Sequence, residues 1–476
     1  MSVRVFDIDL SDEPGPVYLR IADSIRGALR RGVLKPGTLL PSTRDMARQL
    51  MVHRHTVTRG LEELVAEGWI EPEPGRGYRV LATGGQMQGL EQSQWPEFPV
   101  VQQLGHSEEV SYSFPSGKPD LRLFPTDEFF REVRNTLRSV PPETLLGYSN
   151  PAGCLAFRQE LKAYLARMRG LTEGEVLVTH GSQEAIFLLG QLLARGRRRT
   201  IFVEGLGYPP AWDALRMSGA ELVGIPVDEQ GIQVDVLEQM ARENPPALLY
   251  LTPLHQYPTT VTLSLSRRKR LLHLIAELEV PVIEDDYDHE FHYQGKPSLP
   301  LAGDDTSGLV MYVSTFSKLV YPSSRIGFCL VPSQLLEPLS RLKRSVTRQN
   351  DLLLQFSMAR WMHSGGLDRH LRKMRKVYSQ RLGTMVDGLG RLGLEPVVPK
   401  GGMSVWVDLG RSWRKVLELC NFKGLKLRPG SFYQLAPVER WESYLRLGFA
   451  SSTSEEIEDG LALLGESLSE ARGGWV

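Results

Sequence analysis

The stretch of residues 314–328 combines side chains suited to carbonyl chemistry with side chains suited to phosphate binding. Lys318 lies there among small hydroxyl residues, and Arg325 follows seven positions later. A lysine amine attacks a carbonyl group only when burial or a cationic neighbour favours its neutral form. Hydroxyl groups and a guanidinium are good phosphate ligands, so Thr315, Ser317 and Arg325 could form a clamp. An amine that can form a Schiff base beside a phosphate clamp is what pyridoxal phosphate requires.

Taken alone, Lys318 is better explained as a surface lysine that follows an edge strand. A cofactor site at Lys318 therefore needs support from other parts of the chain. Residues 175–179 predict a buried strand, and residues 182–194 predict an apolar helix that begins at a glycine-serine turn. The free N–H groups and the dipole at such a helix start both favour phosphate. Ser182 and Gln183 are therefore candidate phosphate ligands.

Two further predicted strands end in side chains suited to a planar ring. Residues 200–204 predict a strand, and Tyr208 just beyond it could stack on such a ring. Residues 280–283 predict a strand that leads into a run of acids, at the edge where open α/β sheets bind ligands. Asp285 facing a pyridine nitrogen would keep it protonated, and Tyr287 could meet a ring hydroxyl. The acids could instead bind a metal, but no histidine or acid spacing elsewhere completes such a site.

The elements that must position these residues form two units. Residues 111–476 alternate strand and helix patterns, which predicts a mostly parallel sheet wrapped by helices. The first eighty residues instead predict a winged helix-turn-helix. Its three helices are expected at residues 16–31, directly after the N-cap Ser42, and at residues 53–67. Residues 83–110 are polar and rich in Gly and Gln, which predicts a flexible linker.

The charge pattern of the N-terminal unit fits DNA. Residues 1–80 hold 12 Lys and Arg against 11 Asp and Glu, but residues 44–59 hold four arginines and one acid. In helix-turn-helix docking, the start of the third helix reaches base edges, and a wing tip suits a backbone or minor-groove contact. The candidate DNA ligands are Arg44, Arg54, Thr56, Thr58 and Arg76. The alternative is a small interaction domain with a solvated basic face.

The composition narrows the class of protein. The chain of 476 residues is 41% apolar and 24% charged, and its 56 basic residues balance 56 acids. Three separated cysteines match neither a zinc site nor a disulfide framework, which favours a reducing cytoplasm. We expect no signal peptide, no membrane-spanning segment and no metal.

Three motifs of the N-terminal unit resemble the signature of the GntR-type winged-helix family over residues 12–82. The motifs lie at residues 40–47, 52–57 and 64–70. The resemblance implies that Arg44, Arg54 and Thr56 contact operator DNA. His53 stands where the family usually has a serine that caps the recognition helix.

The ordered signals of the larger unit resemble a fold-type I pyridoxal-phosphate aminotransferase over residues 112–470. The resemblance implies that Lys318 carries the Schiff base and that Asp285 pairs with the pyridine nitrogen. Tyr287 would meet the phenolic oxygen, and Tyr208 would stack on the ring. The implied phosphate ligands are Ser182, Gln183, Thr315, Ser317 and Arg325.

The same resemblance implies an α/β fold with a small α+β domain at about residues 395–470. Arg446 would grip the α-carboxylate of a substrate, as a bidentate guanidinium can. Residues 148–153 resemble the loop that reaches the neighbouring subunit's site in such dimers, so we expect a homodimer.

The two units together resemble the MocR subfamily of GntR-type regulators. Most aminotransferases have Asn-Pro-Thr-Gly where residues 257–260 of this chain read Tyr-Pro-Thr-Thr. His255 or Gln256 would therefore have to bond the oxygen of the cofactor ring. Members that sense γ-aminobutyrate are expected to have an arginine at the position of Pro210, which argues against that effector.

We therefore expect a DNA-binding transcriptional regulator whose C-terminal domain senses an amine or amino acid through aldimine exchange at Lys318. Pyridoxal phosphate itself is the alternative signal. A working aminotransferase with a vestigial head is the alternative function, and a regulator could retain a transaminase half-reaction. A cofactor-free dimer scaffold is disfavoured because Lys318, Asp285 and Arg325 are all present.

The expected domains are a winged helix-turn-helix at residues 12–82, the linker at 83–110 and the cofactor domain at 111–476. The expected partners are double-stranded operator DNA, the small effector and a second copy of the chain. The linker is long enough for each head to lie over the partner subunit. We expect the protein in the bacterial cytoplasm, associated with the nucleoid.

Overall fold

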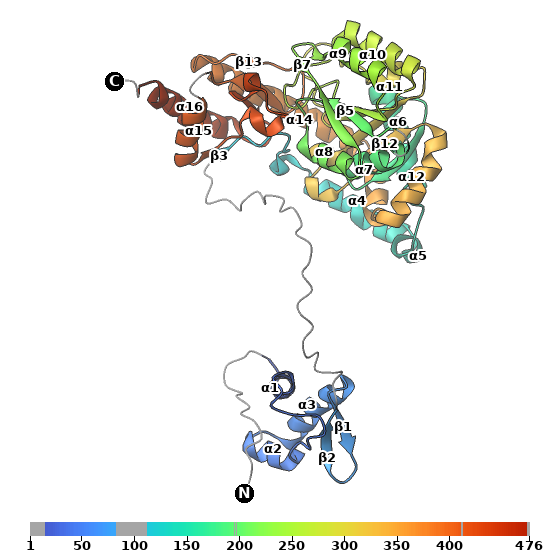
Figure 1. Ribbon diagram of the computed structural model, residues 1–476, viewed down its shortest axis with the longest axis vertical. Helices are drawn as coiled ribbons and strands as arrows, with labels where there is room; N and C mark the ends of the chain where they lie inside the picture. Colours follow the sequence, from blue (N-terminus) through green and yellow to red (C-terminus); the bar gives the residue numbers. More distant parts are fainter. Residues whose placement is uncertain (1–14, 82–111, 195, 197, 411–412, 474–476) are drawn as a thin grey trace. The chain divides into compact units, whose positions relative to one another are not determined.

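The computed structural model describes residues 15–81, 112–194, 196, 198–410 and 413–473 (Figure 1). The chain divides into two compact units, Met1–Gly105 and His106–Val476. The linker that we predict at residues 83–110 lies outside the described residues. No helix in the described ranges is long and apolar enough to cross a membrane.

The N-terminal unit is a winged helix-turn-helix, as the sequence predicts. Its elements are α1 (Val17–Arg30), α2 (Thr43–Gln49), α3 (Arg54–Ala66), β1 (Ile70–Glu73) and β2 (Gly77–Val80). Ser42 caps α2 as predicted, because its side chain accepts a hydrogen bond from the Asp45 N–H at 3.2 Å. A Cβ at Gly60 of α3 would lie 2.6 Å from the Tyr18 carbonyl oxygen of α1. The backbones of α1 and α3 therefore pack in direct contact.

A seven-stranded sheet organises the large unit. In spatial order its strands are β4 (Glu175–Thr179), β12 (Gly327–Val331), β11 (Val310–Thr315), β10 (Val282–Asp286), β9 (Leu248–Leu251), β5 (Thr200–Glu204) and β6 (Glu221–Ile225). Only β12 runs antiparallel to its neighbours among these strands. The prediction of a mostly parallel sheet is confirmed. Strands β9 and β12 are apolar and buried along their whole length, which is typical of a sheet that is covered on both faces.

Helices cover both faces of this sheet (Figure 1). One face packs against α7 (Ser182–Leu193), α8 (Pro209–Arg216) and α12 (Ser333–Val346). The other packs against α6 (Leu155–Arg169), α9 (Val234–Glu243), α10 (Leu265–Leu278), α13 (Leu352–His363) and α14 (Gly366–Arg391). Three further helices are α4 (Thr126–Ser139), α5 (Pro142–Leu146) and α11 (Leu301–Asp304). Successive side chains of β10 point to opposite faces of the sheet. Ile283 packs in the core on the α7 side, and Val282 packs in the core on the α9 and α10 side.

A smaller sheet forms the core of the C-terminal α+β domain. It consists of β13 (Pro396–Val397), β14 (Ser404–Asp408) and β16 (Tyr444–Gly448). The accompanying helices are α15 (Trp413–Phe422) and α16 (Ser454–Gly473). The first described strand of the large unit, β3 (Tyr112–Ser113), pairs in parallel with β15 (Leu425–Lys426) of this domain. Residues 112–113, where the described part of the large unit begins, are thus joined directly to the small domain.

The strand that carries the acid run, β10, ends three residues later than residue 283, the predicted end. It continues through Asp286, because Asp285 and Asp286 pair in register with Val313 and Ser314 of β11. The first acids of the run therefore lie inside the sheet, where burial requires a specific partner for each carboxylate.

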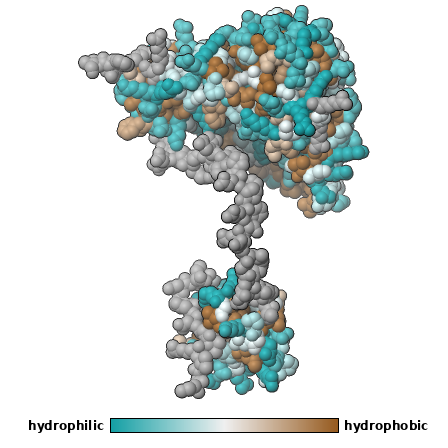
Figure 2. All heavy atoms as spheres, viewed as in Figure 1, coloured by the Kyte–Doolittle hydropathy of each residue, from teal (hydrophilic) through white to brown (hydrophobic). Residues whose placement is uncertain are grey.

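The surface of the large unit is mixed in polarity. Figure 2 shows polar residues over much of the visible face, with hydrophobic residues interspersed among them. Exposed large hydrophobic residues recur along one segment around α4 and α5. They are Phe130, Leu137, Leu146, Tyr148 and Leu155.

Candidate functional site

A pocket of about 710 Å³ lies between the loops of the large sheet and the small C-terminal sheet. Lys318 and Arg446 contribute to its walls from the two sides, together with Tyr257 and Tyr433. The segment just after β3 closes another side, since Gly117 also lines the pocket. The pocket thus brings together residues that lie far apart in the sequence.

Lys318 projects from a single 3-10 turn, Phe316–Lys318, that ends β11. A Cβ at Gly117 would lie 3.5 Å from both Cε and Nζ of Lys318, so the amine reaches the opposite wall. Burial lowers the pKa of Lys318, and the nearby guanidinium groups of Arg446 and Arg325 act in the same direction. The carboxylates of the acid run oppose this shift. The amine is therefore easier to deprotonate than an ordinary lysine, as carbonyl chemistry requires.

Asp285 offers one free oxygen to a ligand. Its Oδ2 accepts a hydrogen bond from the Tyr250 hydroxyl at 2.7 Å. Its Oδ1 is buried and has no hydrogen-bond partner among the described residues. Burial raises the pKa of Asp285 to about 7, and the neighbouring Asp286 adds to the effect. A protonated ring nitrogen would satisfy this oxygen and hold the carboxylate in its charged form.

The predicted phosphate ligands converge at the end of β11 and the start of α7. The Thr315 hydroxyl donates to Ser317 Oγ at 3.0 Å and accepts from the Ser317 N–H at 3.1 Å. Arg325 has a left-handed backbone with φ of 47°, and its Nη2 donates to the His180 carbonyl at 2.6 Å. A Cβ at Gly181 would lie 3.1 Å from that nitrogen, so a glycine is needed there.

The N-terminus of α7 lies against this cluster. A Cβ at Gly327 would lie 2.7 Å from the Ser182 nitrogen, which shows how closely β12 approaches the helix start. Unpaired N–H groups of a first helical turn favour an anion. The Gln183 amide is already engaged, because it donates to the Pro210 carbonyl. The backbone N–H of Gln183 is then the group available to a phosphate.

Aromatic rings form one wall of the site. Tyr208 ends the loop after β5, and its ring centroid lies 5.2 Å from that of Tyr257. The Tyr257 ring also contacts Tyr287 at 6.0 Å and Tyr433 at 5.5 Å between centroids. Burial raises the pKa of Tyr208. These rings offer an apolar surface to a planar ligand.

Arg446 is a buried guanidinium that forms no ion pair with an acid of the described residues. It lies on β16 and is only 3% exposed. Its Nη1 donates to the Pro258 carbonyl at 2.6 Å, and its Nη2 donates to the Tyr287 hydroxyl at 3.2 Å. Its Nε has no partner among the described residues, and its Cζ lies 4.3 Å from the Tyr257 ring centroid. A buried charge of this kind calls for an anionic ligand.

Of the two residues expected to bond the oxygen of the cofactor ring, Gln256 is engaged elsewhere, and His255 stays a prediction. The Gln256 amide donates to the Leu206 carbonyl at 2.8 Å, and its oxygen accepts from the Thr259 hydroxyl at 2.6 Å. His255 Nδ1 lies 2.6 Å from Asp288 Oδ1, and although burial opposes it, this carboxylate raises the pKa of His255. Both side chains hold the loop together. The Gln256 amide has no group left for the cofactor, whereas the Nε2 of His255 forms no hydrogen bond with the described residues.

The other acids of the run have separate structural partners. Glu284 accepts from the N–H groups of Leu301 and Ala302 at 2.7 and 2.9 Å, and so caps α11. Asp286 accepts from the Tyr312 hydroxyl at 2.5 Å. Within the described part of the chain, no group of three His, Cys, Asp or Glu side chains is arranged to hold a metal ion.

Two residues next to the cofactor site, Tyr250 and Ser324, were not predicted from the sequence. Tyr250 bonds Asp285, but in the sequence it is one apolar strand residue among others. Ser324, next to Arg325, has a buried hydroxyl without a described partner. A hydroxyl within the arginine-containing turn was a signal for Ser324, whereas nothing local marked Tyr250.

The predicted DNA ligands lie on the surface of the N-terminal unit. Arg44 and Arg54 are exposed, and Arg54 Nε donates to the Thr43 hydroxyl at 3.0 Å, which joins α3 to α2. Thr56 is half-buried, and Thr58 bonds back to the Arg54 carbonyl at 3.1 Å within its own helix. Thr58 is therefore less available to DNA than the arginines.

The wing and the helix cap complete this face. Arg76 at the wing tip is exposed and lies 3.3 Å from Glu73, a pair too exposed to hold it firmly. His53 caps α3 in place of the usual serine, because its Nδ1 accepts from the His55 N–H at 3.2 Å. The histidine thus supplies the missing cap.

Comparisons with known proteins agree with this architecture. The description of aminotransferase class I and II matches residues 125–464, and that of bacterial regulatory proteins of the gntR family matches residues 17–80. The uncharacterized HTH-type transcriptional regulator YdeL of Bacillus subtilis is 30% identical over 94% of this chain and 96% of its own length. The probable rhizopine catabolism regulatory protein MocR of Rhizobium meliloti is 30% identical over 78% of this chain and 76% of its own length.

A solved structure shares the fold of the larger unit. The α-aminoadipate aminotransferase LysN of Thermus thermophilus, complexed with N-(5'-phosphopyridoxyl)-L-leucine, superposes with a TM-score of 0.69. It is 28% identical over 77% of this chain and 93% of its own. The family match, Lys318 and the free oxygen of Asp285 identify pyridoxal phosphate as the cofactor that this unit is built to hold. The chain belongs to the MocR subfamily of GntR-type transcriptional regulators, in which a winged-helix head precedes a domain of the aminotransferase class I and II family.

Proposed function

We propose that the C-terminal domain senses an amino acid and passes the signal to the DNA-binding head. The observation that carries this proposal is Arg446, a buried guanidinium in the same pocket as Lys318 that forms no ion pair within the described part of the chain. When bound, pyridoxal phosphate supplies an aldehyde carbon with which one amine at a time can form an imine. The amino group of an effector would compete with Lys318, while Arg446 would hold the effector's α-carboxylate.

The remaining residues would hold the cofactor in place. We propose that Asp285 pairs with the ring nitrogen and that Tyr208 packs on the ring face. Tyr287 would meet the ring oxygen by turning its hydroxyl hydrogen away from the His255 carbonyl, to which it donates at 2.9 Å. The phosphate would be held by Thr315, Ser317, Arg325, Ser182 and the backbone of Gln183.

The head, residues 12–82, would bind double-stranded operator DNA through α3 and the wing, ahead of a linker at 83–110 and the cofactor domain at 111–476. Arg44, Arg54 and Thr56 would contact the DNA from the start of α3 and from α2, and Arg76 would contact it from the wing. Such a protein would act in the bacterial cytoplasm, at the nucleoid.

We propose a homodimer in which each head lies over the partner subunit. The exposed apolar residues around α4 and α5 support a second copy on this surface, since Leu146 is 86% exposed and Tyr148 is 79% exposed. Arg348 lies 4.0 Å from the Tyr148 ring centroid and fixes that side chain in its exposed position.

The test combines two measurements on the full-length protein. Visible absorbance reports the bound cofactor, and Lys318→Ala should abolish the absorbance of the covalently attached form. Affinity for a DNA fragment selected from a random library should change when an effective amino acid is added. Arg446→Ala should retain the cofactor and lose the response to amino acids. A wild-type response to amino acids in Arg446→Ala would remove this residue from the effector site.

A working aminotransferase is the second candidate function, because the lowered pKa of Lys318 also suits catalysis. Turnover of an amino acid with an oxo acid at about 1 s⁻¹ or faster would favour the enzyme. Turnover far below that rate, together with an amino-acid-dependent change in DNA affinity, would favour the sensor.

A further inference from the structure

The charges around the 710 Å³ pocket are unbalanced. The lining residues include five cations and no Asp or Glu. The cations are Lys118, Lys318, Lys426, Arg428 and Arg446. The proposed function provides partners for Lys318 and Arg446 alone. Lys118, Lys426 and Arg428, which are exposed at the mouth of the pocket, remain without an anion.

The cofactor phosphate does not account for the three cations at the mouth. Its proposed ligands, which include Thr315, Ser317 and Arg325, do not line this pocket. Lys118, Lys426 and Arg428 also form no ion pair with an acid in the described ranges. The excess positive charge therefore faces the space where an effector would enter.

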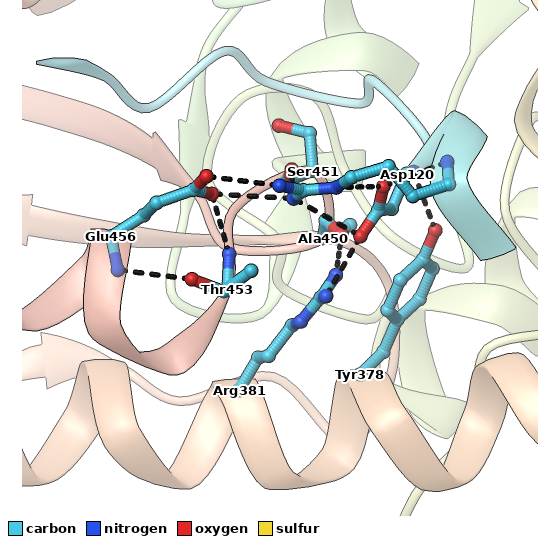
Figure 3. Close-up of polar contacts among 8 residues, drawn as sticks. Asp120, Tyr378, Arg381, Ala450, Ser451, Thr453 and Glu456 are labelled. Atoms are coloured by element: carbon cyan, nitrogen blue, oxygen red, sulfur yellow. Dashed lines mark hydrogen bonds and ion pairs between the residues drawn. The ribbon is translucent and has the colours of Figure 1, made fainter. Parts of the chain in front are cut away.

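A neighbouring pocket of about 680 Å³ shows the opposite arrangement. Its wall includes Asp120, Arg122 and Glu456, and Figure 3 shows the network to which these belong. Arg122 pairs with Asp120 at 2.8 Å and with Glu456 at 2.9 Å, and Arg381 pairs with Asp120 at 2.8 Å. The protein neutralises Asp120, Arg122 and Glu456 there, and Lys118 lines this pocket as well as the first. In the first pocket the missing anion has to come from a ligand.

Arg428 is the best placed of the three cations. Its guanidinium lies 4.7 Å from the Phe432 ring centroid, which limits its freedom before a ligand binds. Arg428, Tyr433 and Arg446 line the same pocket. Tyr257 contacts Tyr433 and Arg446 in turn. Arg428 and Arg446 thus line one pocket together with the aromatic side chains of Tyr257 and Tyr433.

We propose that this pocket selects an amino acid whose side chain ends in a second anionic group. Arg446 binds the α-carboxylate, and Arg428 binds the distal anion with help from Lys426. This inference rests on the proposed function, because it names the effector class of the same site. A guanidinium binds a carboxylate or a phosphate through two parallel hydrogen bonds. Exposed cations at the mouth also attract an anionic ligand, and salt weakens that attraction.

The test uses full-length protein loaded with pyridoxal phosphate and follows the visible absorbance of the bound cofactor. Each anionic probe is compared with an uncharged counterpart: L-glutamate with L-glutamine, L-2-aminoadipate with L-norleucine, and O-phospho-L-serine with L-serine. The last pair separates a phosphate from a carboxylate as the distal anion. In at least one pair, the anionic amino acid should produce half of its full absorbance change at a concentration about tenfold lower than its uncharged counterpart. High salt should reduce this preference.

Variants separate the mouth from the rest of the site. Arg428→Met should weaken the anionic member about tenfold and bring it near its uncharged counterpart. Arg428→Lys should keep part of the preference, because the charge remains but the planar fork is lost. Lys423→Met is the matched control, since Lys423 lies on the same segment but pairs with Glu466 at 2.8 Å and Glu470 at 2.6 Å. This control should keep the full preference.

Equal half-saturation within every pair would overturn the inference and leave the proposed function standing. A preference that survives Arg428→Met would remove Arg428 from the site and overturn it as well. If no amino acid of either kind changes the absorbance, the proposed sensing of amino acids fails, and this inference fails with it.

Discussion

The buried carboxylate of Asp285 should make the stability of the cofactor-free protein depend on pH. Burial raises its pKa to about 7, well above the ordinary value for Asp. The folded state therefore holds this proton more tightly than the unfolded state does. Its contribution is largest below about pH 4 and is lost as the pH rises to about 7, by up to roughly 4 kcal/mol.

Asp285→Asn should remove this share of the pH dependence. Urea unfolding of the cofactor-free protein at pH 5 and pH 8 measures it for the wild type and the variant. Glu284 and Glu204, whose burial raises their pKa values to about 8 and about 7, remain in both proteins. The difference between the two proteins therefore reports Asp285 together with its smaller effect on Glu204, whose pKa the Asp285 charge also raises. Identical pH dependence in both would contradict the pKa proposed for this carboxyl group.

Arg54 should contribute to DNA affinity through a phosphate or a base edge. Arg54→Ala should weaken binding to the selected DNA and lower the slope of log affinity against log salt by about one. Arg59 is the useful comparison, because its guanidinium lies 4.0 Å from the Tyr18 ring centroid and is held by α1. Arg59→Ala should lower the stability of the head more than it changes the salt slope. Unaltered binding by Arg54→Ala would take Arg54 off the list of DNA ligands.

Some residues of the site could be predicted from their types and spacing, whereas others depend on contacts between segments that are distant in the sequence. Lys318 and Arg325 could be found because a lysine and an arginine among hydroxyl residues are unusual after an apolar strand. The bond between Tyr250 and Asp285 could not, because it joins two strands whose pairing the sequence does not state. His255 or Gln256 was expected to bond the cofactor, but local hydrogen bonds occupy the polar groups of Gln256 and the Nδ1 of His255.

At the scale of helices, the contact between α1 and α3 should be the most sensitive point of the head. Gly60→Ala should destabilise the head by about 1–3 kcal/mol, because the new Cβ would lie 2.6 Å from a backbone oxygen of Tyr18. Gly27→Ala in α1 is the matched control, since its Cβ would meet only the flexible Arg31 side chain, at 3.2 Å. That change should be neutral or stabilising, by up to about 1 kcal/mol. Thermal melting of both variants measures the difference, and equal destabilisation would refute the close crossing.

The elements were easier to predict than their arrangement. Apolar runs located strands such as β4 and β5 correctly, since hydrophobic residues followed by turn residues mark a buried strand. The end of β10 was placed too early, because acids are rare in a sheet interior and only tertiary partners make them tolerable. The order of the seven strands, with β12 inserted antiparallel between β4 and β11, depends on contacts that no local pattern encodes.

At the scale of the whole molecule, the head and the large unit have separate cores. The apolar core of the head consists of residues from α1, α2, α3 and the wing, and the cores around the large sheet draw on none of them. A ligand stabilises the unit to which it binds, by about 2.7 kcal/mol at a concentration one hundred times its dissociation constant. The two units should therefore respond separately to their own ligands when DNA is absent.

Scanning calorimetry of the full-length protein should show this separation. Pyridoxal phosphate should raise the transition of the large unit alone, and Lys318→Ala should reduce that increase. With selected DNA bound, an effective amino acid should also move the transition of the head, because a regulator must couple the two binding events, and coupling is reciprocal. A shift of the head transition by the cofactor without DNA would show that the units are already coupled. No shift by the amino acid with DNA bound would contradict the sensing function, even if the amino acid binds at Arg446.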